Sequence, residues 1–191
     1  MTPGARAAVA SPSTGEPPPG PLRDLDFPGI FEAHFDYVWN TLRRLGVQRA
    51  DVEDVTHDVF VAVLRKLDQY DPERPLRPWL FGFAFRVASD YRELARHRFE
   101  HASDDGELED GRPSALDNAM QHQELGLAKR ALTALELGRR AVFILHELDA
   151  CPMPEVARAL GIPLNTAYSR LRLARADLAA AARRLRLQGD P

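Results

Sequence analysis

Apolar residues recur every three or four positions through the first half of the chain, with polar residues between them, as on the buried faces of successive α-helices. The three series are Phe31, Phe35, Val38, Leu42 and Leu45; Val52, Val55, Val59, Val63 and Leu67; and Leu80, Phe83, Val87, Tyr91 and Leu94. Gly46 is predicted to end the first helix, and Asp51 to cap a second that runs to Tyr70. A proline-rich loop then precedes a third helix, expected from about Trp79 to Arg98.

The second half of the chain repeats the helical pattern. Its apolar positions are Leu125, Ala128, Leu132, Leu135 and the run 141–145. Two prolines follow, after which we expect a short helix that ends at Leu160 and a turn that contains Gly161. A long final helix is predicted from about Leu164 towards Arg186. Because no segment alternates apolar and polar residues as a strand would, the fold class is predicted to be all-α.

Shifts in composition divide the chain. Residues 1–24 are rich in Pro, Gly, Ala and Ser and are predicted to be a disordered tail. Residues 100–121 contain many Asp and Glu with interspersed Gly, which is typical of a flexible, self-repelling linker. The sequence therefore predicts two small helical domains, 25–99 and 122–187, joined by a flexible acidic linker.

Composition and charge exclude several classes of protein. No apolar run approaches the roughly 18 residues that a membrane span needs, so we expect no membrane insertion. The N-terminus lacks the pattern of a secretion signal, and the single cysteine suits a reducing cytoplasm. We find no phosphate-binding glycine loop, nucleophile motif or metal-ligand spacing, so no enzyme activity, cofactor or metal is expected. The net charge of −3 says little about binding to nucleic acid, because the basic residues are clustered and can form a local positive patch.

The segment 154–175 has the arrangement of a helix-turn-helix, with Gly161 in the turn and small residues where the two helices would cross. On a helical wheel, the second helix has one apolar face that is predicted to be buried, with Ala167, Leu171, Ala174, Leu178 and Leu185. The side chains predicted to face DNA from the other sides are Asn165, Tyr168, Ser169, Arg170, Arg172 and Arg175. Amide and guanidinium groups on such a face can read base edges in the major groove. The alternative is a solvated face of an ordinary helical bundle.

A second surface lies opposite the apolar series of the predicted helix 51–70. Its residues are Asp54, His57, Asp58, Val61, Leu64 and Arg65. Val61 and Leu64 are apolar where an isolated helix should be polar, and an apolar centre with a charged rim is typical of a protein-binding surface. The alternative left open by the sequence is that another helix of the same domain covers them.

A third surface combines the proline-rich loop with the helix after it. Trp79 and Arg86 are seven residues apart, hence on the same side of that helix, away from Leu80 and Phe83. With Tyr70, Arg74 and Arg77 they form the set predicted to stack on and clamp single-stranded bases. The alternative is that Trp79 belongs to the core.

Together these motifs resemble the extracytoplasmic-function (ECF) sigma factors of the RNA polymerase sigma factor family. The run 54–60 resembles the acidic helix that docks on RNA polymerase. Trp79-Leu80, Phe83-Ala84 and Asp90-Tyr91 resemble the helix that melts and reads the −10 promoter element. Glu155-Val156-Ala157, Gly161-Ile162 and the run 165–171 resemble the helix-turn-helix that reads the −35 element, and the resemblance adds Thr166 to that face.

The chain also departs from the family pattern at several positions. His57 and Asp58 stand where Gln and Glu are usual, and Arg86 where many members have Asn. Pro163 replaces a Ser that would cap the final helix, and Leu173 occupies a position that is commonly basic. These departures bear on the contacts with DNA rather than on the fold.

The resemblance implies a bacterial transcription initiation factor in the cytoplasm. It would bind core RNA polymerase, direct it to promoter DNA through the −10 and −35 elements, and be held inactive by an anti-sigma factor. One alternative is a conventional helix-turn-helix regulator that does not dock on polymerase. Another is a helical protein-interaction adaptor, which predicts no sequence-specific contact with DNA.

Overall fold

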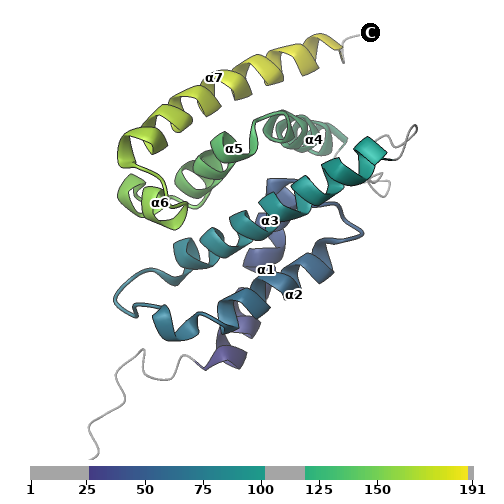
Figure 1. Cartoon of the computed structure of the whole chain (residues 1–191). Helices are drawn as coiled ribbons and strands as arrows, with labels where there is room; N and C mark the ends of the chain where they lie inside the picture. The colour runs from purple at the N-terminus through teal and green to yellow at the C-terminus, as the bar shows by residue number, and fades with distance from the viewer. Residues whose placement is uncertain (1–25, 102–118, 189–191) are drawn as a thin grey trace, which may run out of the picture.

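The computed structural model describes residues 26–101 and 119–188, and all of its regular structure there is helical (Figure 1). The predicted all-α fold class is confirmed. The elements are α1 (Phe27–Leu45), α2 (Val52–Leu64), the 3-10 turn η1 (Leu67–Gln69), α3 (Leu76–His101), α4 (Ala119–Thr133), α5 (Leu137–Phe143), the π-helical turn η2 (Ile144–Leu148), α6 (Met153–Ala159) and α7 (Leu164–Gln188). The predicted tail and most of the predicted linker lie outside the described residues. None of the described helices combines the length and apolar character that a membrane span requires.

Helices α1, α2 and α3 pack against one another and form the first unit. The Asp26 carboxylate caps α1 by accepting a bond from the Gly29 N–H at 3.1 Å. As predicted, Gly46 ends the helix, with φ of 101°, a left-handed conformation that glycine adopts without strain. Phe60 is buried at the centre of an aromatic cluster with Phe31 and Phe35.

Two predicted boundaries in this unit were wrong. Helix α2 ends at Leu64 rather than Tyr70, because η1 takes over and keeps Leu67 against the core, which prolongs the apolar spacing. Helix α3 begins at Leu76, three residues before Trp79. Its first turn accommodates Pro78, since no backbone N–H is needed there.

Two predicted residue roles were also wrong. The Asp51 side chain does not cap α2, because its backbone is already in the right-handed helical region; it accepts a bond from the Tyr91 hydroxyl instead. Leu94 is 62% exposed rather than buried. Since Tyr91 reaches the residue just before α2, Leu94 lies beyond the end of the helix that would have covered it.

Helices α4 to α7 form the second unit, in which α7 packs on α4, α5 and α6. The sequence 154–175 is a helix-turn-helix, as predicted: α6 ends at Ala159 and Gly161 adopts φ of 64° in the turn. Ala167 and Ala174 are fully buried and Leu171 nearly so, which confirms the first turns of the buried face that the wheel gave to α7. Leu178 and Leu185, predicted on the same face, are only partly buried.

The two units lie against each other, which the sequence did not predict. In Figure 1 helices α4 to α7 lie over the first three helices, and α6 contacts α3 while α4 and α5 contact α1. Buried residues of both units join in one continuous core. Contacts between residues that are far apart in the chain, rather than any local sequence pattern, therefore set the shape of the described molecule.

Candidate nucleic-acid and protein interfaces

All six residues of the second predicted surface are exposed on α2 and at its end. Val61 is 45% exposed and Leu64 is 53% exposed, so no described helix covers them and the alternative of intramolecular cover does not hold. The His57 ring is stacked parallel to Phe31, with centroids 6.3 Å apart, which fixes its orientation at the edge of the aromatic cluster. The result is a preformed apolar patch of Val61 and Leu64 that follows Asp54 and Asp58 along α2, with Arg65 at its end.

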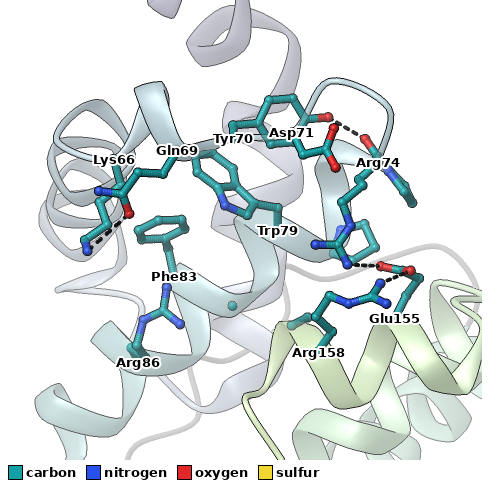
Figure 2. A pocket seen from close by; sticks show the side chains of 14 residues that line it. Lys66, Gln69, Tyr70, Asp71, Arg74, Trp79, Phe83, Arg86, Glu155 and Arg158 are labelled. Atoms are coloured by element: carbon teal, nitrogen blue, oxygen red, sulfur yellow. Dashed lines mark hydrogen bonds and ion pairs between the residues drawn. The ribbon is translucent and has the colours of Figure 1, made fainter.

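The third predicted surface is a pocket of about 290 Å³ at the start of α3 (Figure 2). Its aromatic wall is continuous: the Trp79 ring lies 4.9 Å from Tyr70 and 4.8 Å from Phe83, centroid to centroid. The Arg86 guanidinium lies over the Phe83 ring at 4.6 Å. Tilted and edge-on rings can stack on a planar base, and a cation beside them can balance the charge of the phosphate of the same nucleotide.

Four of the five side chains predicted to clamp single-stranded bases line this pocket: Tyr70, Arg74, Trp79 and Arg86. Arg77 does not, because its guanidinium lies 5.3 Å from the centre of the Tyr37 ring on α1. Trp79 was predicted to lie away from Phe83, and this was wrong, since residues four apart on a helix are neighbours. Burial lowers the pKa of Arg86 and raises that of Tyr70, whose hydroxyl donates to the Arg74 carbonyl.

The other side of the pocket comes from α6, which sequence reasoning missed. Arg74 forms an ion pair of 3.4 Å with Glu155, which also pairs with Arg158 on the next turn. A Cβ atom on Gly82 would lie 2.5 Å from the Ala159 carbonyl oxygen, so only glycine permits this approach. The one sequence signal that could have revealed this close approach of α6 was Gly82, a glycine inside a helical pattern. Lys66 and Gln69, which also line the pocket, were missed as well.

The α7 face predicted to meet DNA is open. Asn165, Tyr168, Ser169, Arg172 and Arg175 are exposed, and Thr166 and Arg170 are half-buried. The structure therefore brings the predicted residues together on one helix surface and leaves it accessible.

Two arginines of this face have partners within their own unit. The Arg175 Nε donates to Glu147 at 2.9 Å. The Arg170 guanidinium lies against Gly138, close to Glu136, whose carboxylate caps α5 through the N–H groups of Gly138 and Arg139. Burial opposes ionisation of Glu136, but these bonds and the nearby Arg170 keep its pKa below the usual value. Both arginines are thus pre-positioned by carboxylates that a phosphate would have to replace.

In the part of the chain that the structure describes, no three His, Cys, Asp or Glu side chains converge on a possible metal position. The buried Cys151 has a pKa raised to about 11, first by burial and then by the charges of Glu155 and Asp149.

Comparison with known proteins agrees with this division into two units. The profile of Sigma-70 region 2 matches residues 30–98, and that of Sigma-70 region 4 matches residues 125–178. The chain is 32% identical over 158 residues to the RNA polymerase sigma factor NccH of Alcaligenes xylosoxydans xylosoxydans, covering 81% of this chain and 85% of that protein. It is 32% identical over 146 residues to CnrH of Cupriavidus metallidurans, covering 72% and 76%.

Solved structures give the same result. CnrH in complex with the cytosolic domain of CnrY superposes with a TM-score of 0.57 at 29% identity, over 81% of this chain and 85% of that one. The sigma factor RpoE of Bartonella quintana, in complex with the anti-sigma factor NepR, has a TM-score of 0.62 at 20% identity, over 87% and 99%. The second likeness concerns the fold alone.

Proposed function

The chain belongs to the sigma-70 family as an ECF sigma factor, and from this premise we propose which of its surfaces bind polymerase, the −10 element and the −35 element. As such it is a transcription initiation factor that binds core RNA polymerase and directs it to promoters. The conventional regulator and the adaptor are not favoured. The surfaces proposed below carry that function in this chain.

The proposed polymerase-binding surface is the exposed face of α2, with Asp54, His57, Asp58, Val61, Leu64 and Arg65. The observation that supports it is the exposure of Val61 and Leu64 within a charged rim. Exposure of an apolar patch of this kind to water is unfavourable, and a bound partner would cover the patch and remove it from water.

The proposed −10 surface is the aromatic pocket, with Tyr70, Arg74, Trp79 and Arg86. The tilted rings of Tyr70 and Trp79 support it, because stacking on aromatic side chains accepts any flipped base. Arg77 is retained in the proposed set only as a flanking phosphate contact, since its guanidinium lies on Tyr37.

The proposed −35 surface is the open face of α7. Asn165, Ser169 and Arg172 would meet base edges, while Thr166, Tyr168, Arg170 and Arg175 would contact the backbone. The burial of Ala167, Leu171 and Ala174 on the opposite side supports this rotation of the helix.

We also propose an anti-sigma factor as a further partner. Two solved relatives are described as complexes with CnrY and with the anti-sigma factor NepR. In this chain a groove of about 830 Å³ lies between α1, α4 and α7, with Leu127, Leu132 and Leu178 on its walls and Arg43 and Arg44 at its rim. Its shape and charge suit an amphipathic helix with acidic residues.

The remaining proposals concern organisation and location. Domains at 25–99 and 122–187, separated by the acidic segment 100–121 and preceded by the tail 1–24, fit the grouping of the described helices into two units. The protein would act without catalysis of its own, and would work in the cytoplasm, where RNA polymerase lies.

The experiment that tests the polymerase assignment uses the double variant Asp58→Arg, Leu64→Asp. It places a positive charge and a carboxylate on the patch, so binding to bacterial core polymerase and run-off transcription should both be lost. Glu53→Arg, an exposed change on the same helix outside the proposed patch, is the matched control. Undiminished binding by the double variant, with its helical circular dichroism unchanged, would refute the assignment.

A further inference from the structure

The first two turns of α7 carry an exposed apolar pair. Leu164, the first residue of the helix, is 42% exposed, and Tyr168 is 54% exposed. Residues four apart lie on the same side of a helix, so these two side chains are neighbours. Pro163, directly before the helix, is exposed as well. The tip of the proposed −35 surface is therefore apolar, although the rest of that surface is polar.

Leu164 lies at the end of the helix that would enter the major groove first. In a helix-turn-helix the N-terminal residues of the second helix contact the base edges. Side chains of a helix tilt towards its N-terminus, so the Leu164 side chain projects ahead of α7. When the −35 surface docks as proposed, Leu164 therefore points towards the edges of the bases.

Tyr168 connects Leu164 to the polar side chains that are proposed to read bases. Arg172 follows Tyr168 by four residues and Asn165 precedes it by three, so both adjoin it on the helix surface. A tyrosine has an apolar ring and a polar hydroxyl, so its ring can pack beside Leu164 while the hydroxyl contacts the DNA backbone. The result is one surface in which a leucine lies close to an amide and a guanidinium.

The chemistry of the major groove determines what a leucine can read there. The base edges of unmodified DNA present hydrogen-bond donors and acceptors, and one apolar group, the C5-methyl of thymine. A leucine side chain has no donor or acceptor, so the thymine methyl is the group that it can recognise. Packing of the two removes apolar surface from water, which is favourable. The Arg172 guanidinium suits guanine instead, so the surface as a whole fits an element that contains both G·C and A·T pairs.

A role in the fold alone does not explain this leucine. The apolar side chains that pack α6 on α7, such as Val156 and Leu171, are buried, whereas Leu164 is not. An apolar pair four residues apart stabilises a helix only slightly, and by the same amount whatever DNA is bound. A purely structural Leu164 would therefore affect all promoter sequences alike.

We propose that Leu164 is a specificity-determining residue of the −35 surface, which recognises an A·T pair by packing on the C5-methyl group of its thymine beside the Tyr168 ring. The proposal rests on the proposed −35 surface and adds to it a class of base pair that this chain prefers.

The test uses holoenzyme assembled from the full chain and bacterial core polymerase. Its promoter carries a −35 element selected by transcription from a randomised library. Each thymine of that element is replaced in turn by deoxyuridine, which lacks only the C5-methyl group and keeps every hydrogen-bonding atom. At one position at least, uracil should weaken binding of the parent holoenzyme by about four-fold, the effect of burying one methylene group. The Leu164→Ala holoenzyme should bind the thymine and uracil promoters equally at that position.

Control variants separate methyl recognition from a general loss of binding. Leu187→Ala makes the same change at an exposed leucine roughly 35 Å further along α7, and should keep the preference for thymine. Leu164→Met conserves the apolar volume and should restore the preference that Leu164→Ala loses. If Leu164→Ala lowers the helical circular dichroism, Leu164→Gln takes its place, because it replaces the apolar end of the side chain by an amide and should likewise remove the response to the methyl group.

Equal binding of the thymine promoter and every uracil promoter by the parent holoenzyme would overturn the proposal. So would an unchanged thymine preference in Leu164→Ala, or a selected −35 element without thymine in either strand. Failure of the −35 surface itself would give a different result, since Asn165→Ala and Arg172→Ala would then leave the selected −35 sequences unchanged. If those two variants alter the selected sequences while Leu164→Ala does not, the methyl contact alone is wrong.

Discussion

The two proposed DNA-reading surfaces differ in how the fold presents them. The pocket around Trp79 is aromatic, half-buried and narrowed by α6, whereas the α7 face is polar and open. The second unit lines the aromatic wall with Glu155, Arg158 and Ala159 of α6, whereas Asn165, Ser169 and Arg172 of α7 are exposed to water.

The comparison teaches that a polar DNA-reading face such as that of α7 can remain exposed to water, whereas an aromatic surface such as the Trp79 pocket is packed against other parts of the protein. The α7 residues proposed to read bases are exposed in the described arrangement. Single-stranded bases that entered the proposed pocket would pass Glu155 and Arg158 of α6. The predictions below test each side of this contrast, from the largest expected effect to the smallest.

The pocket side is tested by Trp79→Ala. A base stacked on an aromatic ring typically contributes about 1–3 kcal/mol, so open-complex formation should drop by roughly 5- to 150-fold. Arg77→Ala is the matched control, because Arg77 was predicted to share this role but lies on Tyr37, and its loss should have a smaller effect. Binding of holoenzyme to a non-template-strand oligonucleotide measures both. Equal losses would mean that the pocket is not where the bases bind.

The open side is tested by comparing Arg172→Ala with Arg175→Ala. Loss of a base-reading arginine costs about 1–3 kcal/mol and relaxes specificity at one position, so Arg172→Ala should change which −35 variants are transcribed. Arg175 already has Glu147 as a partner, and as a phosphate contact its loss should weaken all sequences alike and lower the salt slope by about one unit. Transcription over a −35 library at two salt concentrations separates the two. Identical behaviour would mean that α7 is rotated in the groove from the proposed position.

The contact between α3 and α6 is tested by Gly82→Ala. Alanine stabilises a helix interior by about 0.5–1 kcal/mol relative to glycine, so in a molecule whose units are apart the melting temperature should rise. With α6 in place, the new Cβ would lie 2.5 Å from the Ala159 carbonyl oxygen, and overpacking of this kind costs about 1–3 kcal/mol. We therefore expect a lower melting temperature. Gly126→Ala, where nothing lies within 4 Å of a Cβ, is the control for helix propensity.

The sequence predicted the parts of this molecule that depend on local order. Most of the helical series, the Gly46 and Gly161 turns and the first turns of the buried face of α7 were predicted correctly, because spacing and glycine conformation act within a few residues. The exceptions lie at helix ends, where Leu94 is exposed and α2 stops at Leu64. What it missed depends on contacts between distant residues. The Arg74–Glu155 pair joins residues 81 positions apart, and the Arg140 bond to Leu45 joins residues 95 apart. No periodicity encodes such pairings, so neither the covered pocket nor the buried arginine could be predicted.

The smallest expected effect concerns Cys151, whose thiol reports on its own burial and on two acidic side chains of the second unit. Burial, Glu155 and Asp149 raise the pKa of its thiol from 9.0 to about 11, in that order of importance. Since the thiolate is the reactive form, the shift alone should slow labelling by a disulfide reagent at pH 8 by roughly a hundred-fold relative to an unperturbed thiol. Labelling should accelerate as pH rises towards 11, because a raised pKa leaves the thiol protonated below it.

Asp149→Asn removes one of the two charges that raise this pKa, while Tyr37 can still donate to the amide oxygen. Labelling at pH 8 should therefore become faster, but only modestly, because burial is the largest cause and Glu155 remains. Glu147→Gln, whose carboxylate is not among the causes of the shift, is the matched control and should leave the rate unchanged. A rate for Asp149→Asn equal to that of the parent chain at every pH would mean that Asp149 does not face Cys151 in solution. The loop that carries Asp149 towards Tyr37 and Arg44 would then differ from the described arrangement.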